Sequence, residues 1–312
     1  MLTEIRTVTA RAPASCANYF AGYDILGCAF DRLFDTVTLE KRKDHRLVVI
    51  SNDNIPQCPD ENTATVAMRA FLQTVSIPIG FDVIIKKGIP IASGLGGSAA
   101  SAVAAIIALR QFFKDPICLD EAIKYALIGE SYASGQVHGD NVIPCFIGGL
   151  ALVQSVEPLS YLQLPTPKMN RVIVHPDLSL ETRKLRKILP KNYSQRDCIQ
   201  QYQHVASFVA GLYLRSHDIL EKHAVDLMAT PYRLHAYPVL NYVRNAALEQ
   251  GARMAGISGA GPTMMAMVED QEKVNLVMEA MQLAFKENGI DSMAWQDQGN
   301  SKGAWEINQC TM

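Results

Sequence analysis

The sequence lacks the features that mark several specialised classes of protein. Its formal net charge is only −2, so no excess of positive charge favours binding to nucleic acid or to an anionic membrane surface. No apolar run approaches the roughly 20 residues that cross a bilayer. Residues 1–6 do not show the charged and then apolar pattern of a signal peptide. These absences predict a cytoplasmic protein that binds neither nucleic acid nor membrane.

The cysteines disfavour two further kinds of protein. The chain has 7 cysteines, an odd number, and none are spaced as Cys-x-x-Cys. Scattered cysteines of this kind indicate reduced thiols rather than a disulfide scaffold or a zinc site. With 312 residues, of which 48% are hydrophobic, the chain can instead bury a sizeable core, in one large domain or two smaller ones.

Hydrophobic periodicity and turn signals predict a mixed α+β protein. Segment 157–169 contains three prolines and reads as a linker, which divides the chain into domains of residues 1–160 and 161–312. Strands are expected at 6–10, 36–41, 47–51, 81–86, 171–175, 254–258 and 264–268, with a final element at 291–296. Helices are expected at 60–75, 98–113, 120–134, 197–215, 218–228, 238–250 and 271–286.

The most informative segment is a glycine-rich loop at residues 90–101, which runs from the strand at 81–86 into an alanine-rich helix. Free N–H groups and the positive end of the dipole make a helix N-terminus bind anions, and glycines let the main chain approach phosphate closely. The segment is neither a P-loop nor the Gly-x-Gly-x-x-Gly dinucleotide pattern. A flexible turn before a core helix is the alternative. We predict nucleotide phosphate contacts from Pro90, Ile91, Ala92, Ser93, Gly94, Leu95, Gly96, Gly97, Ser98, Ala99 and Ala100.

Four segments, in order, resemble the GHMP kinase superfamily and, within it, the homoserine kinases. The loop at 90–101 is similar to the superfamily pattern Pro-x-x-x-Gly-Leu-Gly-Ser-Ser-Ala-Ala, with Gly97 in place of the first Ser. Segments 13–27 and 138–149 are similar to the homoserine kinase opening and its His-Pro-Asp-Asn-Val segment, and 256–263 resembles the third superfamily motif. The resemblance implies a two-domain α+β GHMP kinase fold, with an N-terminal ATP-binding domain, a C-terminal α/β-sandwich-like domain, an active site between them, and a homodimer.

Glu130 is the first candidate for chemistry. It follows Ile123 and Leu127 on the apolar face of the helix expected at 120–134, so its carboxylate should point inward. A buried carboxylate needs a cation or a metal partner, and a structural ion pair is the commoner outcome. The resemblance implies instead that Glu130 and Ser98 hold Mg²⁺ against the phosphates of ATP. Magnesium prefers a few protein oxygens together with phosphates and water, which fits this pair.

Two polar residues follow the first strand. Asn18 and Asp24 read locally as turn residues, because their side chains hydrogen-bond nearby backbone. The resemblance implies that they contact an amino-acid substrate, L-homoserine: Asn18 near the attacking hydroxyl and Asp24 near the ammonium group. Residues 19–21 depart from the family loop, and Cys16 replaces a Ser, so the pocket wall is expected to differ there.

Two arginines are candidate partners for the substrate carboxylate. Arg186 lies in the basic run 183–187, which by itself is typical of a solvated helix face, and Arg233 is expected in a short loop between helices. The resemblance adds His138 and Gly259 to the substrate contacts. No second His or Cys lies at ligand spacing from His138, so the alternative for it is a core histidine rather than a metal ligand.

The resemblance also implies a mechanism without a dedicated base. Asn141 stands where mevalonate and galactose kinases use an Asp, and an Asn cannot take a proton. Positioning and charge neutralisation carry most of phosphoryl transfer, so Asn18 and Asn141 are expected to orient the hydroxyl. Asn62 and Lys87 fall where the family touches the nucleoside, although both also read as surface residues. The expected activity is ATP-dependent phosphorylation of L-homoserine in threonine biosynthesis; a mevalonate-type kinase and a non-catalytic ligand-binding relative are the alternatives.

Overall fold

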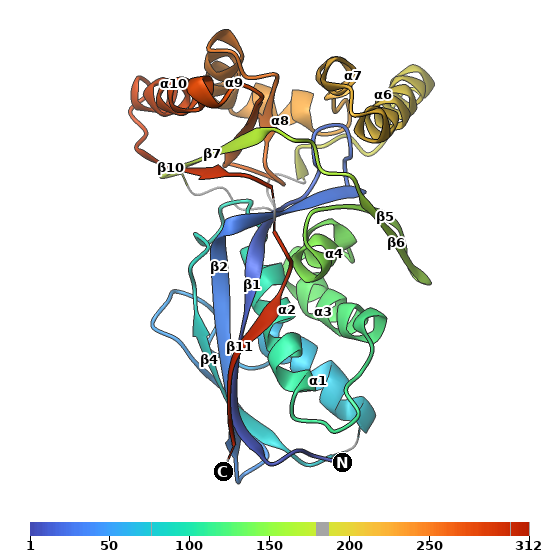
Figure 1. The fold of residues 1–312 in the computed structure, drawn as a ribbon, viewed down its shortest axis with the longest axis vertical. Coiled ribbons are helices and arrows are strands. Elements are labelled where there is room, and N and C mark those ends of the chain that lie inside the picture. The colour runs from blue at the N-terminus through green and yellow to red at the C-terminus, as the bar shows by residue number, and fades with distance from the viewer. Residues whose placement is uncertain (76, 179–186, 300, 312) are drawn as a thin grey trace.

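The first half of the chain forms a large sheet with helices packed on one face (Figure 1). The structure, a computed structural model, describes residues 1–75, 77–178, 187–299 and 301–311. The sheet has the strand order β11-β1-β2-β4-β3, with β5 paired to β2 and β6 to β5. Only the β3–β4 pair runs parallel among the strand pairs of this sheet within the described residues. Its strands are β1 (Ile5–Cys16), β2 (Leu26–Arg42), β3 (Leu47–Ile50), β4 (Gly80–Lys86), β5 (Leu150–Val156), β6 (Leu159–Leu164) and β11 (Trp305–Thr311).

Helix α2 occupies the centre of the helical layer. Every residue from Ala99 to Leu109 is buried, because this segment carries only small and aliphatic side chains and one Ser. A helix that is apolar on all sides must be surrounded by other elements, and α2 contacts β1, β2 and three neighbouring helices. The helices of this layer are α1 (Thr63–Val75), α2 (Gly97–Arg110), α3 (Leu119–Ser134) and α4 (Gly139–Ile147).

The second half of the chain builds a smaller antiparallel sheet with the order β10-β7-β9-β8, covered by α9 and α10. Their contact buries a separate apolar core. The elements are β7 (Asn170–Pro176), α6 (Gln195–Leu214), α7 (His217–His223), α8 (Thr230–Ala236), α9 (Val239–Glu249), β8 (Met254–Ile257), β9 (Met264–Val268), the 3₁₀ helix η1 (Gln271–Lys273), α10 (Val274–Lys286) and β10 (Ser292–Asp297). The α+β fold with two layered units, predicted from the sequence, is confirmed.

Some predicted elements are wrong in extent. Segment 157–169 is no simple linker, because β6 lies within it and pairs antiparallel with β5. The first helix begins three residues later than expected, since the side-chain oxygen of Asn62 accepts the N–H of Ala64 at 3.0 Å and caps it. The helix expected at 218–228 ends at His223, because the carboxylate of Asp226 takes the N–H groups of residues 228–230.

The last described strand returns to the first sheet. β11 pairs antiparallel with β1, where Thr7 faces Cys310, and Figure 1 places both ends of the chain at the same end of this sheet. The division into residues 1–160 and 161–312 stays a prediction, and β11 crosses it. Of the helices that the structure describes, none combines the length and the apolar character needed to span a bilayer.

Candidate active site

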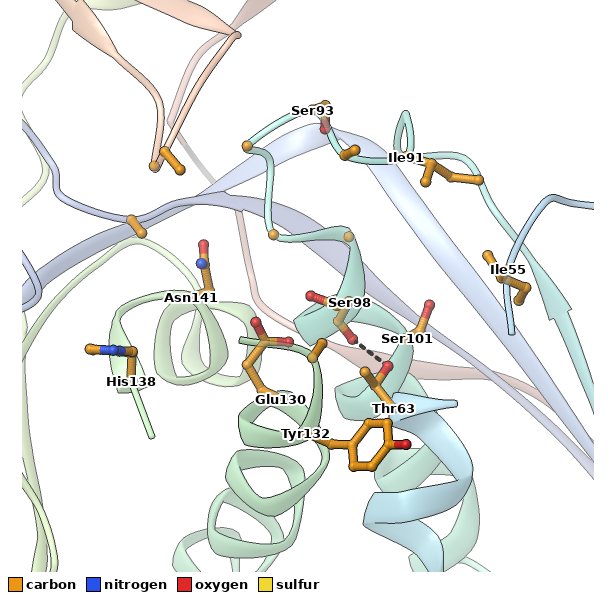
Figure 2. Close-up of a pocket in the computed structure, with 18 of the residues that line it drawn as sticks. Ile55, Thr63, Ile91, Ser93, Ser98, Ser101, Glu130, Tyr132, His138 and Asn141 are labelled. Atoms are coloured by element: carbon orange, nitrogen blue, oxygen red, sulfur yellow. Dashed lines mark hydrogen bonds between the residues drawn. The ribbon is translucent and has the colours of Figure 1, made fainter. Parts of the chain in front are cut away.

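Residues from both halves of the chain line one cavity of about 540 Å³. Its walls come from the β1–β2 connection, the glycine loop before α2, the ends of α1, α3 and α4, helix α8 and the loop after β8. Figure 2 shows a pocket lining around the first turn of α2, with side chains from α1 and α3 facing it. The fold therefore brings segments far apart in the sequence to one site.

Most residues predicted from the sequence line this cavity. Leu95, Ala99 and Ala100 do not, because their side chains are fully buried in the core beneath the loop. Pro90 is also outside the lining, and Arg186 lies outside the described residues. The predicted residues in the lining are Asn18, Asp24, Asn62, Lys87, Ile91, Ala92, Ser93, Gly94, Gly96, Gly97, Ser98, Glu130, His138, Asn141, Arg233 and Gly259.

At two positions, the glycine loop has a backbone conformation that only glycine adopts readily. The φ angles of Gly94 and Gly96 are 79° and 65°. A Cβ at Gly96 would lie 2.2 Å from the Ser15 hydroxyl oxygen, and one at Gly94 would lie 2.6 Å from the Ser258 carbonyl oxygen. Helix α2 starts at the next residue, Gly97, and no side chain in the described structure caps it. Its first N–H groups and its dipole therefore suit phosphate oxygens.

Two of the other three motifs, at 13–27 and 256–263, hold this loop in place. The main-chain N–H of Ser15 donates to the carbonyl of Leu95 at 3.0 Å. From the far half of the chain, the Ser258 hydroxyl donates to the carbonyl of Gly94 at 3.0 Å, and the N–H of Thr263 donates to that of Ser93 at 3.3 Å. These motifs, which are far apart in the sequence, are therefore in direct contact in the fold.

A buried charged cluster lies behind the loop. The ammonium group of Lys87 forms an ion pair with Asp35, and it donates to the Gly97 carbonyl at 2.7 Å and to the Ser101 hydroxyl at 3.1 Å. The Asp35 carboxylate also accepts from Ser101 at 2.8 Å and from the N–H groups of residues 88 and 89 at 3.2 Å. Lys87 therefore uses its donors on protein groups and ties β2 to the first turn of α2.

Sequence reasoning missed Asp35, although a signal was present. Successive side chains of a strand alternate between the two faces of a sheet. Asp35 therefore lies on the same face of β2 as Val37 and Leu39, which are fully buried, and its carboxylate points inward. A fully buried Asp requires a cation, and Lys87 at the end of the paired strand β4 is that cation.

Ser98 and Glu130 face the cavity from α2 and α3, respectively. Glu130 is 8% exposed, so its predicted inward direction is confirmed. The Thr63 hydroxyl donates to the main-chain carbonyl of Ser98 at 3.1 Å (Figure 2), which fixes the first turn of α2 against α1. One hydroxyl and one carboxylate beside a helix N-terminus that suits phosphate form an oxygen set that fits Mg²⁺.

Asn18, Asp24 and His138 gather at another part of the wall. The Asn18 side chain accepts the N–H of Asp24 at 2.8 Å and donates to the Gly259 carbonyl at 3.1 Å. The φ of Asn18 is 55° and that of Asp24 is 59°, in the left-handed region that these residue types tolerate. His138 Nδ1 lies 3.4 Å from the Asp24 carboxylate. Asn18 therefore makes the local turn contact expected from its residue type and also lines the cavity, while its contact with a substrate stays a prediction.

Arg233 lies on helix α8, so its predicted place in a loop is wrong. Pro231 near the helix start explains how a segment that looks like a turn begins a helix. Arg233 is only 3% exposed, and its guanidinium donates to the Gly259 carbonyl at 2.7 Å. Beside Gly96, the Asn141 side-chain oxygen accepts the Ser15 hydroxyl at 2.9 Å.

The altered segment 19–21 packs away from the cavity. The rings of Tyr19 and Phe20 lie 4.9 Å apart, and each centroid is 6.1 Å from that of Phe208 on α6. All three side chains are buried, and the Ala21 carbonyl accepts the Gln201 side chain at 2.6 Å. The aromatic residues thus anchor the β1–β2 connection to α6, and the cavity wall there is made by Asn18 and Asp24 instead.

The far end of the cavity has apolar side chains that sequence reasoning did not assign. Ile55 and Tyr132 line it together with Ile91, and Figure 2 shows them on the side of Ser98 away from His138. Ile91 and Tyr132 are 48% and 47% exposed. Asn62, predicted to touch a nucleoside, uses its amide to cap α1 and to donate to the Pro56 carbonyl at 3.0 Å.

Buried cysteines lie beneath the site. Burial raises the pKa of Cys16, and it raises the pKa of Cys145 well above its usual range. Both side chains are therefore neutral thiols near pH 7.

Comparison with known proteins gives consistent matches. The GHMP kinases N terminal domain matches residues 62–149, and the GHMP kinases C terminal domain matches residues 208–287. The chain is 36% identical over 297 residues to the homoserine kinase of Xylella fastidiosa (strain M12), covering 94% of this chain and 92% of that protein. It is 33% identical to the homoserine kinase of Chlorobaculum tepidum, covering 96% and 98%.

A solved structure agrees with these matches. The crystal structure of homoserine kinase from Cytophaga hutchinsonii superposes with a TM-score of 0.93 at 31% identity, covering 98% of this chain and 99% of that one. The glycine loop at 90–101, the cavity lined by both halves of the chain and these matches lead to one conclusion. The chain belongs to the GHMP kinase family, among its homoserine kinases.

Proposed function

We propose that this protein transfers the γ-phosphoryl group of ATP to the side-chain hydroxyl of L-homoserine and forms O-phospho-L-homoserine, in the route to threonine. The observation that carries the proposal is the composition of one cavity. It joins the uncapped start of α2, the oxygen pair Ser98 and Glu130, and the charged pair Asp24 and Arg233. The first two features suit a metal-bound nucleotide, and the third suits an amino acid.

The nucleotide is assigned to the α2 side of the cavity. The N–H groups of the glycine loop bind the phosphates, and the apolar side chains of Ile55, Ile91 and Tyr132 offer a surface for the base. Ser98 and Glu130 are the residues that would hold Mg²⁺, which when bound neutralises charge on the phosphate oxygens. Lys87 acts on the nucleotide indirectly, because its ammonium group holds the Gly97 carbonyl.

The amino acid is assigned to the opposite side. The Asp24 carboxylate pairs with the substrate ammonium group and the Arg233 guanidinium with its carboxylate. His138 and the Gly259 carbonyl contribute from the same wall. The resemblance adds Arg186 as a second partner for the carboxylate. Opposite charges at fixed positions select a zwitterion over a neutral sugar.

In this proposal the hydroxyl is positioned rather than deprotonated by a strong base. Asn18 and Asn141 line the cavity and offer amide groups to the hydroxyl. The neighbouring Asp140 is 2% exposed, and its carboxylate accepts the N–H of Asn18 at 3.3 Å, so it orients that residue. A loose transition state needs little nucleophile activation, and alignment with the phosphoryl group supplies most of the rate. A biosynthetic kinase of this kind fits the cytoplasm predicted from the sequence.

The proposal is tested by measuring ADP release with MgATP and L-homoserine, beside L-threonine, mevalonate, galactose and a sample without acceptor. Phosphorus NMR then identifies the product as a phosphate monoester of the acceptor. Turnover that strongly favours L-homoserine is the expected result. Turnover on mevalonate or galactose alone would retain the phosphate site and reject the roles of Asp24 and Arg233. Binding of ATP without turnover on any acceptor would indicate a non-catalytic relative.

A further inference from the structure

The buried face of helix α6 carries the polar side chain of Gln201, which is only 6% exposed. Its amide nitrogen donates to the Ala21 carbonyl at 2.6 Å, and its amide oxygen accepts the N–H of Leu227 at 2.8 Å. A buried amide needs such partners. Because one partner is an acceptor and the other a donor, reversing the amide would break both contacts. Gln201 therefore holds two backbone segments at once.

The first of these segments carries the candidate partner of a substrate ammonium group. Ala21 is fully buried in the β1–β2 connection, three residues from Asn18 and three from Asp24. The Asn18 side chain accepts the N–H of Asp24 at 2.8 Å, so these residues form one turn. The position of the Ala21 carbonyl therefore helps to fix the turn that places Asp24 in the cavity wall.

The second segment leads into helix α8, which carries Arg233. Next to Leu227, the buried carboxylate of Asp226 accepts the N–H groups of residues 228, 229 and 230 at 2.7, 3.1 and 2.8 Å. The Thr230 hydroxyl donates to the same carboxylate at 2.9 Å. These bonds join Leu227 rigidly to the start of α8, so a displacement of Leu227 would also displace Arg233.

The same two segments are joined a second time at the cavity. The Gly259 carbonyl accepts the Asn18 amide at 3.1 Å and the Arg233 guanidinium at 2.7 Å. Gln201 joins the segments behind the wall, because it is not among the described residues that line the cavity. A single connection between two segments leaves a pivot, whereas two connections at different points also fix the angle between them. Without Gln201, the two segments can turn about the Gly259 carbonyl.

We propose that Gln201 is a positioning residue that sets the separation of the Asp24 carboxylate and the Arg233 guanidinium, and so determines how well the cavity binds an α-amino acid. The inference rests on the proposed function, in which these two groups pair with the ammonium and carboxylate groups of the substrate. Both substrate groups are bonded to one carbon atom, so their separation is fixed and the protein must match it. A small misplacement of either partner therefore weakens binding strongly.

The nucleotide side of the cavity should not depend on Gln201. The glycine loop is held by hydrogen bonds from Ser15, Ser258 and Thr263, and these residues lie outside segments 18–24 and 227–233. The proposal therefore predicts different effects on the two substrates. The charged groups of the amino acid are held alike in the bound state and in the transition state, so the loss should appear in the KM for the amino acid rather than in kcat.

Steady-state kinetics of the natural protein and three variants tests the proposal. Gln201→Met keeps the length of the side chain and removes both hydrogen bonds. Gln201→Asn keeps an amide but is one methylene shorter, so it cannot reach both segments. Each should raise the KM for L-homoserine by about 10–100-fold, leave kcat within about threefold, and change the Kd for MgATP, measured by calorimetry without acceptor, by less than about twofold. The matched control Gln203→Met, at an exposed position of the same helix, should leave all three values unchanged.

Circular dichroism and a thermal melt check that each variant is folded. A KM for L-homoserine within about twofold of the natural value in the folded Gln201 variants would overturn the proposal, and so would an equal rise in the Kd for MgATP, because a general loss of structure weakens both. If the natural protein turns over L-homoserine and the variants match it, only this inference fails. If the natural protein does not turn over L-homoserine, the proposed function fails, and this inference fails with it.

Discussion

The buried ion pair between Asp35 and Lys87 leads to a quantitative prediction about stability. Asp35 is fully buried, and the Lys87 side chain is 7% exposed. Lys87→Met removes the cation with little change in side-chain length and leaves a buried carboxylate without its charge partner. Asp35→Asn keeps the size of the side chain and leaves a buried ammonium group. Removal of one partner of a buried pair costs about 3–5 kcal/mol, so each single change should lower the free energy of unfolding by that amount.

The double variant separates this explanation from a simple loss of contacts. When Asp35→Asn and Lys87→Met are combined, neither charge is left uncompensated, so the total cost should be at least about 2 kcal/mol less than the sum of the single costs. Lys86→Met, at the exposed neighbour, is the matched control and should leave stability unchanged. Because Lys87 also holds the Gly97 carbonyl, its replacement should raise the KM for ATP more than that for the amino acid.

Urea unfolding followed by tryptophan fluorescence is a suitable assay. Trp295 lies in β10 of the second sheet and Trp305 in β11 of the first, so the signal reports on both sheets. Circular dichroism on the same samples tests whether unfolding is two-state. Single variants within about 1 kcal/mol of the natural protein, or a double variant whose cost equals the sum of the single costs, would refute the reasoning.

Three further predictions follow from other parts of the structure. Glu130→Gln should lower kcat with MgATP by about 10²–10³-fold without loss of fold, as measured by steady-state kinetics and a thermal melt, because it removes a carboxylate proposed to hold the Mg²⁺ that neutralises the phosphate oxygens. Gly94→Ala should raise the KM for ATP and lower the melting temperature, since its φ is 79° and its Cβ would lie 2.6 Å from the Ser258 carbonyl oxygen; unchanged values would contradict this. Burial raises the pKa of Asp297 from 3.8 to about 6, so the folded state binds a proton that the unfolded state has already lost in this range. The stability of the natural protein relative to Asp297→Asn should therefore fall between pH 3.8 and about 6, as measured by urea unfolding, and a flat difference would count against the buried carboxyl.

The sequence predicts best those elements whose formation is local. The strand–glycine loop–helix unit at 81–113 is predictable because alternation, glycines and an unbroken apolar helix are adjacent in the chain. The inward direction of Glu130 followed from helical spacing alone and is confirmed by its burial. Such predictions need no knowledge of what the element packs against.

Elements that depend on distant partners were missed or misplaced. Segment 157–169 looked like a linker because of its prolines, and only pairing with β5 makes part of it a strand. Arg233 lies in a helix although the sequence predicts a short loop, since proline is well accepted in the first turn of a helix and Pro231 stands there. Asp35 was overlooked because its partner, Lys87, is 52 positions away and the pairing of β2 with β4 is not visible in the chain. The roles of the cavity residues in binding and catalysis stay predictions.

The pairing of β11 with β1 has a consequence for how the protein is made. Strand β1 begins at Ile5, and the strand that covers its edge begins at Trp305, so almost the whole chain must be translated before this pair can form. At about 5–20 residues per second, the edge of β1 waits on the order of 15–60 s on the ribosome. The nascent sheet is therefore unfinished on one side throughout synthesis. We expect ribosome-bound chains that stop before residue 305 to be bound by chaperones and cleaved by proteases. The released protein, in which β11 covers β1, should be neither bound nor cleaved.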